Sequence, residues 1–129
     1  MNKNLLAIGI VFAVAIITIL VNPKWILIER DAEEKVTYYI KDKFTIFPTT
    51  RKPSSFWVKR VYDVAKPNGA KTMLMHYPVK CDEMSVKIGN TSSYNDRGQI
   101  TSDTIVQNSV WIKVVPGSVM ESIVQKVCN

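Results

Sequence analysis

The side chains able to do chemistry are few in this chain of 129 residues. His76 is the single histidine, and its neighbours Met75 and Tyr77 are typical of a packed or surface position. Hydrolysis requires a nucleophile beside a base, and no serine stands in a nucleophile-elbow motif. Asp82 and Glu83 are adjacent and would point to opposite faces of a strand, which disfavours a paired acid site. We therefore predict no catalytic residue, and we expect that the protein is not an enzyme.

Metal and cofactor sites are also predicted to be absent. A metal site needs several nitrogen, sulfur or carboxylate ligands at workable spacing, and paired cysteines would leave too few. Haem ligation by His76, with methionines nearby, stands as an alternative. The chain has no glycine-rich loop of the kind that holds phosphate. We accordingly predict no metal and no cofactor.

Cys81 and Cys128 are the two cysteines of the chain. An even pair in a small domain behind a targeting segment indicates an oxidising compartment, so we predict a disulfide between them. Closing this loop would stabilise the fold by roughly 4 kcal/mol in the chain-entropy model, with any strain subtracting from that. Two unrelated buried thiols are the alternative.

The last stretch of the chain must position Cys128. Residues 111–118 read as a strand and a Pro-Gly corner, and a helix of about ten residues follows. Ser118 and Glu121 form a capping box, in which the serine oxygen accepts a first-turn N–H and the glutamate accepts the serine's own N–H. Such a short helix is marginal alone in water, so it needs a surface to lie on. Its apolar stripe comprises Val119, Met120, Ile123, Val124 and Val127.

The segments before this helix alternate as strands do. Residues 36–40 are rich in β-formers and pair back on the strand that begins at Trp25, whose indole we expect in the core rather than at a membrane interface. Residues 44–47 extend this hairpin, and residues 48–55 form a loop. Residues 56–64 form the clearest strand. One face of it carries Phe56, Val58, Tyr62 and Val64, interrupted by Arg60, and the other carries Trp57, Lys59, Val61 and Asp63.

A turn at Asn68-Gly69 leads into a returning strand whose apolar row should receive the terminal helix. That row comprises Met73, Met75, Tyr77, Val79 and Cys81. Residues 81–88, with Met84, Val86 and Ile88 alternating, are predicted as the next strand, followed by strands at 100–105 and 110–115. The predicted fold class is α+β: an antiparallel meander sheet of about six strands with one C-terminal helix tethered by the disulfide.

An apolar run from Leu5 to Val21 precedes this domain, with Thr18 as its one polar side chain. As a helix its 17 residues would span roughly 25 Å, slightly less than a bilayer core of about 30 Å. An uncleaved signal anchor and a cleaved signal peptide compete. Cleavage after the small residues 13–15 would leave a strongly apolar new terminus, so we favour the anchor.

We therefore divide the chain into an N-terminal signal anchor or signal peptide, residues 1–22, and an extracytoplasmic α+β domain, residues 23–129. An anchor makes the membrane a partner and holds the domain in the periplasm, whereas cleavage permits export to the surface. The run has no cysteine nearby, which excludes a lipid-modified terminus.

The net charge of +6 is concentrated in one half of the chain. Residues 41–80 hold nine cations against two aspartates, a local balance of +7. Such a half indicates anionic partners, namely acidic lipids, anionic glycans or an acidic protein surface, and nucleic acid is not expected outside the cytoplasm. Lysines on solvent-facing strands are the simpler alternative. The candidate basic patch comprises Arg51, Lys52, Lys59, Arg60, Lys66 and Lys71.

Five features together suggest a family. They are Tyr38-Tyr39-Ile40, the strand-turn-strand leading to Cys81, the aromatic strand at Trp111, Pro116-Gly117-Ser118, and the terminal Val127-Cys128. From about Trp25 to Cys128 the chain resembles the surface-adhesin protein E family of Gram-negative bacteria. The resemblance implies a curved antiparallel sheet whose C-terminal helix is tethered to one face by the disulfide.

The resemblance also implies an envelope or surface protein, in a family with members that bind host matrix and serum proteins. The adhesin members are lipoproteins of the outer membrane, and this chain lacks the cysteine for that modification. No ligand-binding motif can be matched residue by residue.

We accordingly expect a non-enzymatic envelope protein that binds other macromolecules as an adhesin. One alternative is an inner-membrane-anchored periplasmic structural or assembly accessory. Another is a small-ligand carrier that uses the aromatic and methionine face under the helix. The sequence makes no prediction of oligomeric state.

Overall fold

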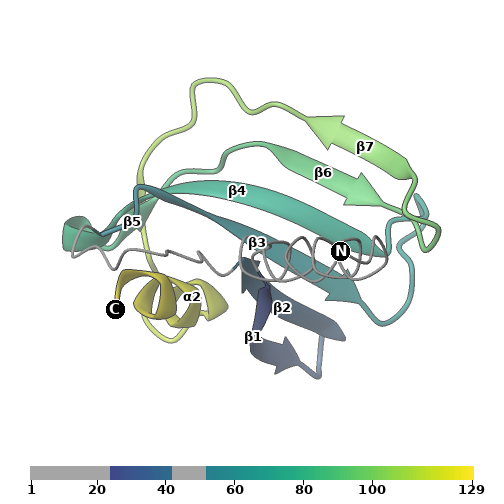
Figure 1. Cartoon of the computed structure of the whole chain (residues 1–129), viewed down its shortest axis with the longest axis horizontal. Coiled ribbons are helices and arrows are strands. Elements are labelled where there is room, and N and C mark those ends of the chain that lie inside the picture. The colour runs from purple at the N-terminus through teal and green to yellow at the C-terminus, as the bar shows by residue number, and fades with distance from the viewer. Residues whose placement is uncertain (1–23, 42–51) are drawn as a thin grey trace, which may run out of the picture.

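The computed structural model describes residues 24–41 and 52–129, which form an antiparallel sheet of eight strands with a helix on one side (Figure 1). A 3-10 turn, η1 (Cys81–Glu83), follows the fourth strand, and helix α2 (Val119–Cys128) comes last. The predicted α+β class and antiparallel sheet are confirmed. The strands are β1 (Trp25–Asp31), β2 (Val36–Lys41), β3 (Ser55–Tyr62), β4 (Thr72–Lys80), β5 (Ser85–Val86), β6 (Thr91–Tyr94), β7 (Ile100–Thr104) and β8 (Ile112–Lys113).

The sheet forks at β4. Strands β1 to β4 follow one another as an antiparallel meander. Along its other edge β4 pairs with two strands, with β6 at residues 72–75 and with β5 at residues 79–80. Strand β7 then pairs with β6, and β8 pairs with β5. The prediction of a simple meander of about six strands was therefore wrong in both strand number and connectivity.

The segment 81–88 also differs from the prediction. Its first three residues form η1, and Met84 follows with a φ of 49° and donates its N–H to the carbonyl of Cys81. This turn reverses the chain, so that Ser85 and Val86 pair back on Lys80 and Val79. The predicted strand was wrong because β5 pairs with the strand just before it, which requires a turn where extended chain was expected.

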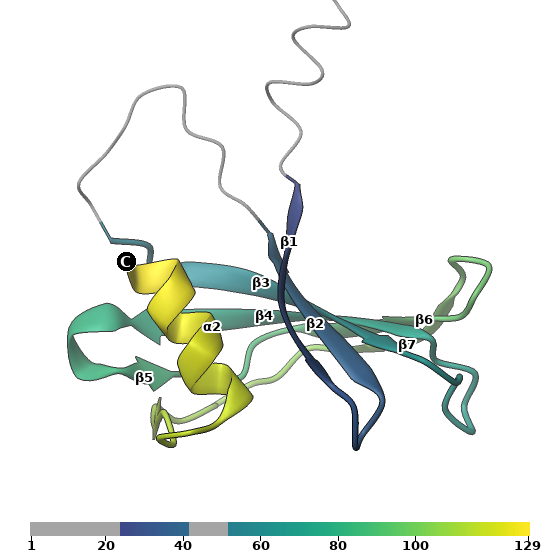
Figure 2. The same ribbon diagram turned by 90° about the horizontal axis from the view of Figure 1, so that it is seen from below.

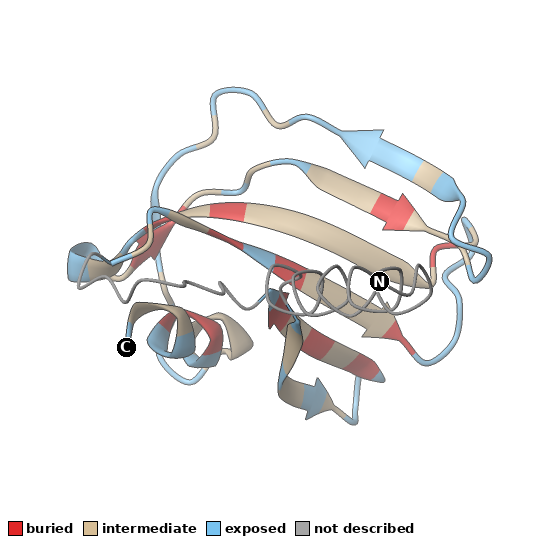
Figure 3. Cartoon of the chain, in the orientation of Figure 1, coloured by how far each residue is buried: buried red, intermediate tan, exposed pale blue. Residues whose placement is uncertain are grey.

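Alternating side chains of β2, β3 and β4 build the core on one face of the sheet, which we call the helix face. Ile40 lies opposite Val58, and Val58 lies opposite Met75. Figure 3 shows the buried residues gathered on these strands and on α2, whereas β7 is mostly exposed. The buried strand residues of this core are Val36, Tyr38, Ile40, Phe56, Val58, Tyr62, Tyr77, Val79 and Val86.

Helix α2 covers one end of the helix face. Figure 2 shows it lying across the ends of β3, β4 and β5. Ile123 and Val124, which are 1% and 0% exposed, enter the same core as Val79 and Val86. Tyr77 and Val79 belong to the same core, so the predicted docking of the helix on the face of β4 that carries the apolar row is confirmed.

The helix begins as predicted at an N-cap serine. The Ser118 hydroxyl accepts a hydrogen bond from the N–H of Glu121 at 3.2 Å. The second half of the predicted capping box is shifted by one residue, because the Glu121 carboxylate accepts the N–H of Gly117 instead of that of Ser118. The Ser118 N–H donates to the carbonyl of Val115 at 3.2 Å, which leaves it unavailable to the glutamate.

The predicted disulfide between Cys81 and Cys128 is confirmed, with a Cα–Cα distance of 5.7 Å. It joins the last residue of α2 to the turn that follows β4. The two cysteines lie 47 positions apart in the chain, so the bond closes a long loop that includes β5 to β8.

Several expectations fall on residues outside the described ranges. They are the N-terminal apolar run, the extension at 44–47, and most of the loop at 48–55. Within residues 24–41 and 52–129, no helix is both long and apolar enough to cross a membrane.

Replacing Cys128 with serine removes the tether. Because the disulfide restricts the unfolded chain, we expect Cys128→Ser to lower the free energy of unfolding by about 4 kcal/mol. Urea denaturation monitored by circular dichroism measures this loss. Cys81→Ser and the double variant are the matched controls, and both should lose the same amount because either change abolishes the same bond. Equal stability of Cys128→Ser and wild type would contradict a stabilising tether.

Ile123 tests the packing of α2 independently of the disulfide. Ile123→Ala removes a buried side chain and should lower the free energy of unfolding by about 2–5 kcal/mol. Ile105→Ala is the control, because Ile105 is 71% exposed and its loss should change stability by less than about 0.5 kcal/mol. Similar losses in the two variants would place Ile123 outside the core.

Candidate binding surface

The face of the sheet opposite α2 carries a second row of large side chains, and we call it the outer face. Register defines it: Leu27 lies opposite Tyr39, Tyr39 opposite Lys59, and Lys59 opposite Leu74. Helix α2 lies on the other face, and no other α-helix occurs in the described residues. The outer face is defined here as Trp25, Leu27, Tyr39, Trp57, Lys59, Leu74, His76, Pro78, Lys80, Lys87 and Trp111.

All three tryptophans of the chain belong to the outer face. Trp57 and Trp111 are each 38% exposed, and Leu27 is 59% exposed. The expectation that Trp25 starts the core was wrong, because its ring is not part of the helix-face core and instead contacts Lys59. Its register opposite Lys41, one position away from the core residue Ile40, places it on this side. The outer face is therefore aromatic rather than simply polar.

Lys59 lies among aromatic rings at one end of the outer face. Its Nζ is 4.7 Å from the ring centroid of Trp25 and 4.9 Å from that of Tyr39. Burial among these groups lowers the pKa of Lys59 below its ordinary value. The rings attract the ammonium through their negative faces, so this lysine is held against the sheet.

A second lysine–aromatic cluster lies where β4, β5 and β8 meet. Trp111 is placed opposite Lys87, which lies beside Pro78 on β4. The Nζ atoms of Lys80 and Lys87 are 4.4 Å and 4.9 Å from the Trp111 ring centroid. Lys113, opposite Ser85 in register, donates from Nζ to the carbonyl of Glu83 at 2.8 Å. We call Lys80, Lys87, Trp111 and Lys113 the Trp111 cluster.

His76 lies between the two clusters and packs on Trp57. The two ring centroids are 4.8 Å apart with an angle of 42° between the planes. Gly89 packs closely against the backbone of His76. Its N–H donates to the His76 carbonyl, and a Cβ built on Gly89 would stand 2.5 Å from that oxygen. His76 is therefore half-buried against Trp57.

The predicted basic patch is distributed over different parts of the fold. Lys59 points to the outer face, whereas Arg60 lies on the helix face with its Cζ 5.4 Å from the Tyr38 ring centroid. The Nε of Arg60 is buried and has no hydrogen-bond partner among residues 24–41 and 52–129. Lys52 forms an exposed ion pair with Asp82 at 3.2 Å. These three cations therefore do not share one surface.

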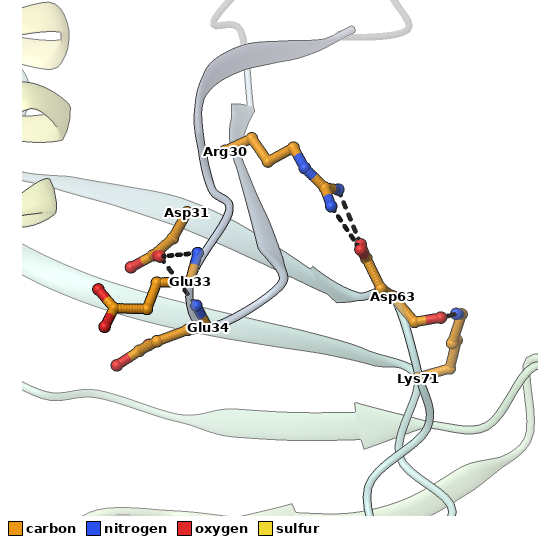
Figure 4. Close-up of polar contacts among 6 residues, drawn as sticks. All are labelled: Arg30, Asp31, Glu33, Glu34, Asp63 and Lys71. Atoms are coloured by element: carbon orange, nitrogen blue, oxygen red, sulfur yellow. Dashed lines mark hydrogen bonds and ion pairs between the residues drawn. The ribbon is translucent and has the colours of Figure 1, made fainter.

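The remaining patch residues lie near the β3–β4 turn. Lys66 places its Nζ 4.6 Å from the ring centroid of Tyr62. Lys71 donates from its Nζ to the carbonyl of Asp63 (Figure 4). Arg51 falls outside the described residues. Although these cations are near one another in sequence, they lie at separate sites within the described part of the chain.

The turn near Lys71 is also fastened to the β1–β2 hairpin. Arg30 donates two hydrogen bonds to the Asp63 carboxylate, one of them at 2.8 Å from Nη1 to Oδ1 (Figure 4). Hydrogen bonding by Arg30 lowers the pKa of the Asp63 carboxyl, and its hydrogen bond with Asp63 raises the pKa of Arg30. At the adjoining turn, the Asp31 carboxylate accepts the N–H groups of Glu33 and Glu34. These contacts fix both turns.

The acidic residues of the described ranges are not gathered into a metal site. No group of three or more His, Cys, Asp or Glu side chains within them could hold a metal ion. Asp82 and Glu83 lie in η1, so the strand-based reason for separating them was wrong. Asp82 pairs with Lys52 instead, and the Glu83 carboxylate lies 3.9 Å from Lys80.

The Trp111 cluster was not found from the sequence. Lys80 and Pro78 lie on the same face of β4. The prediction of a strand at residues 81–88 rested on its apolar residues and did not say which face carries Lys87. The pairing of β5 with β8 joins residues 85–86 to 112–113, and nothing local in the sequence signals it. The sequence therefore gave no sign that Trp111, Lys80 and Lys87 come together.

The fold and this surface define a class of protein: a small disulfide-tethered α+β domain with one helix-covered face and one uncovered aromatic face. A model of the surface-adhesin protein E family matches residues 25–129. The chain belongs to that family, whose members are surface or envelope proteins.

Two further comparisons complete the picture. A crystal structure of protein E from non-typeable Haemophilus influenzae is similar, with a TM-score of 0.49 and 16% sequence identity. The match covers 79% of this chain and 74% of that chain. No curated protein sequence matches this chain.

The Arg30–Asp63 contact predicts a pH-dependent contribution to stability. An unfolded aspartate has a pKa of about 3.9, and that of Asp63 is lower in the folded protein. Its contribution is therefore fully present above about pH 4 and is lost as the pH falls through the lower, folded value. We expect Asp63→Asn to lower the urea midpoint at neutral pH, and the difference from wild type to shrink in acid.

Asp103→Asn is the matched control, because the Asp103 carboxylate accepts a hydrogen bond from the Ser92 hydroxyl but takes part in no described ion pair. Its midpoint should show a smaller pH-dependent difference from wild type. A difference between Asp63→Asn and wild type that grows in acid would contradict the sign of the linkage.

Proposed function

We propose that this chain is a non-enzymatic protein of the cell envelope that binds other macromolecules, as an adhesin, through the outer face of its sheet. The observation that carries this proposal is the one-sided fold. Helix α2 is fastened over the helix face, whereas the outer face presents Trp57, Trp111 and Leu27 to solvent. Family membership supports the same function.

The composition of the outer face supports binding of large partners. Exposed aromatic side chains contribute much contact area with few rotatable bonds, and they are enriched in protein interfaces. The lysines that lie against them add positive charge, which steers encounters with anionic partners. Host matrix proteins and serum proteins with acidic or glycosylated surfaces fit this chemistry.

The location of the domain decides which partners it meets. An uncleaved anchor in residues 1–22 would hold the domain in the periplasm, where an assembly or structural role replaces adhesion. A cleaved segment would release it for the surface. Mapping the mature N-terminus in separated membrane fractions distinguishes the two, and intact chain found in the inner membrane would exclude contact with host proteins.

The small-ligand carrier receives no specific support. It required a site between the methionine row and the terminal helix. Ile123 and Val124 are fully buried in the core that also contains Tyr77 and Val79 of β4. The outer face is thus the better candidate surface.

Binding to immobilised matrix and serum proteins tests the proposal. We expect saturable binding by wild type and weaker binding, by about tenfold, after Lys59→Gln or Trp57→Ala, because both residues belong to the outer face. Surface plasmon resonance measures the dissociation constants. Circular dichroism of each variant confirms that the sheet is retained.

Lys66→Gln is the matched control, because it removes the same charge from the turn beyond β3. Unchanged binding by this variant is expected if the outer face carries the interaction. Equal losses for Lys66→Gln and Lys59→Gln would favour the basic patch predicted from the sequence over the outer face. No saturable binding to any matrix or serum protein would overturn the adhesin function.

A further inference from the structure

We propose that the Trp111 cluster is a binding site for acidic glycan chains, such as sulfated polysaccharides. The inference rests on the proposed function and names the chemistry of one partner. It starts from the contacts of Lys80 and Lys87 with the Trp111 ring, at 4.4 Å and 4.9 Å from its centroid. Neither this ring nor these two lysines belonged to the basic patch expected from the sequence.

The charge of the cluster favours an anionic ligand. Lys52, Lys80, Lys87 and Lys113 surround this corner, and Asp82 and Glu83 are the carboxylates that contact them, which leaves a balance of +2. Asp82 is paired with Lys52, and Glu83 lies 3.9 Å from Lys80. Lys87 forms no described ion pair and contacts only the indole among these groups.

The kind of cation suits anionic groups that are spaced along a flexible chain. A lysine ammonium is a compact charge with three donors on a mobile stem, so it can follow groups at irregular spacing. Trp111 is 38% exposed, and the part of the indole that the lysines leave uncovered offers apolar surface for the C–H groups of a sugar ring.

The dimensions of the outer face favour a polymer over a single sugar. Strands β3, β4, β5 and β8 are successive neighbours, so Trp57 and Trp111 are separated by three strand spacings. At about 4.8 Å per spacing this is about 14 Å, which exceeds the width of one sugar ring. Trp57, stacked on His76, would therefore meet a further unit of a chain that is bound at Trp111.

Titration of the purified full chain with heparin, a sulfated glycan, tests this site. We expect saturable binding that weakens as salt rises, because exposed charge interactions are screened. Lys87→Gln and Trp111→Ala should each weaken binding by about tenfold. Lys87→Arg should retain most of the affinity because it keeps the charge. Isothermal titration calorimetry measures each dissociation constant, and circular dichroism confirms folding.

Lys126→Gln is the matched control, because it removes one lysine from the last turn of α2, on the opposite side of the sheet. Its affinity for heparin should equal that of wild type. Equal affinity for desulfated heparin, or an equal loss in Lys126→Gln, would overturn the proposed site.

Two further binding measurements distinguish the ways in which the glycan site could be wrong. If phosphatidylglycerol vesicles bind through Lys87 and Trp111 while heparin does not, the site recognises a membrane surface and the glycan assignment is wrong. If matrix proteins bind the outer face but heparin does not bind, the glycan site fails and the adhesin function stands. If the protein binds neither matrix proteins nor heparin, both the glycan site and the adhesin function are overturned.

Discussion

The tether between Cys81 and Cys128 is the constraint on which the arrangement of this protein depends. A ten-residue helix has little stability alone, and α2 gains it by burying Ile123 and Val124 and by a covalent link to the turn after β4. Both contacts act on the same side of the sheet. They complete a core on the helix face, so the alternate residues of β2, β3 and β4 lie on the other side.

The composition of the outer face follows from this arrangement, because strand side chains alternate between faces. If Phe56, Val58, Tyr77 and Val79 are buried beneath α2, then Trp57, Lys59, His76 and Lys80 must lie on the opposite side. Most sheets of this kind expose a polar face to water. Here the Trp25 and Trp111 rings are paired with ammonium groups, which cover part of each ring while keeping the charge in solvent. The surface is thus apolar in area and cationic in charge, a combination suited to large anionic partners.

The sequence was informative wherever structure is local. Alternation predicted the faces of β3 and β4, and the Ser118–Glu121 spacing predicted the start of α2. Cysteine count was enough for the disulfide because there were only two candidates. The failures involve non-local pairing. The fork at β4 and the β5–β8 pairing join segments that carry no mutual signal, so the turn at Met84 and the Trp111 cluster were missed. Lys59 and Arg60 point to opposite faces, as alternation along a strand requires, so the described residues of the predicted basic patch do not form one surface.

The one-sided fold underlies the proposal that one face of the sheet holds the domain together and the other meets partners. Hydroxyl-radical footprinting of the full chain, free and bound to an immobilised matrix protein, tests this division most directly. The account predicts rapid labelling of Trp57 and Trp111 in the free protein and their protection in the complex, with labelling of Met120 on α2 unchanged. Protection of Met120 without any change at the tryptophans would contradict it.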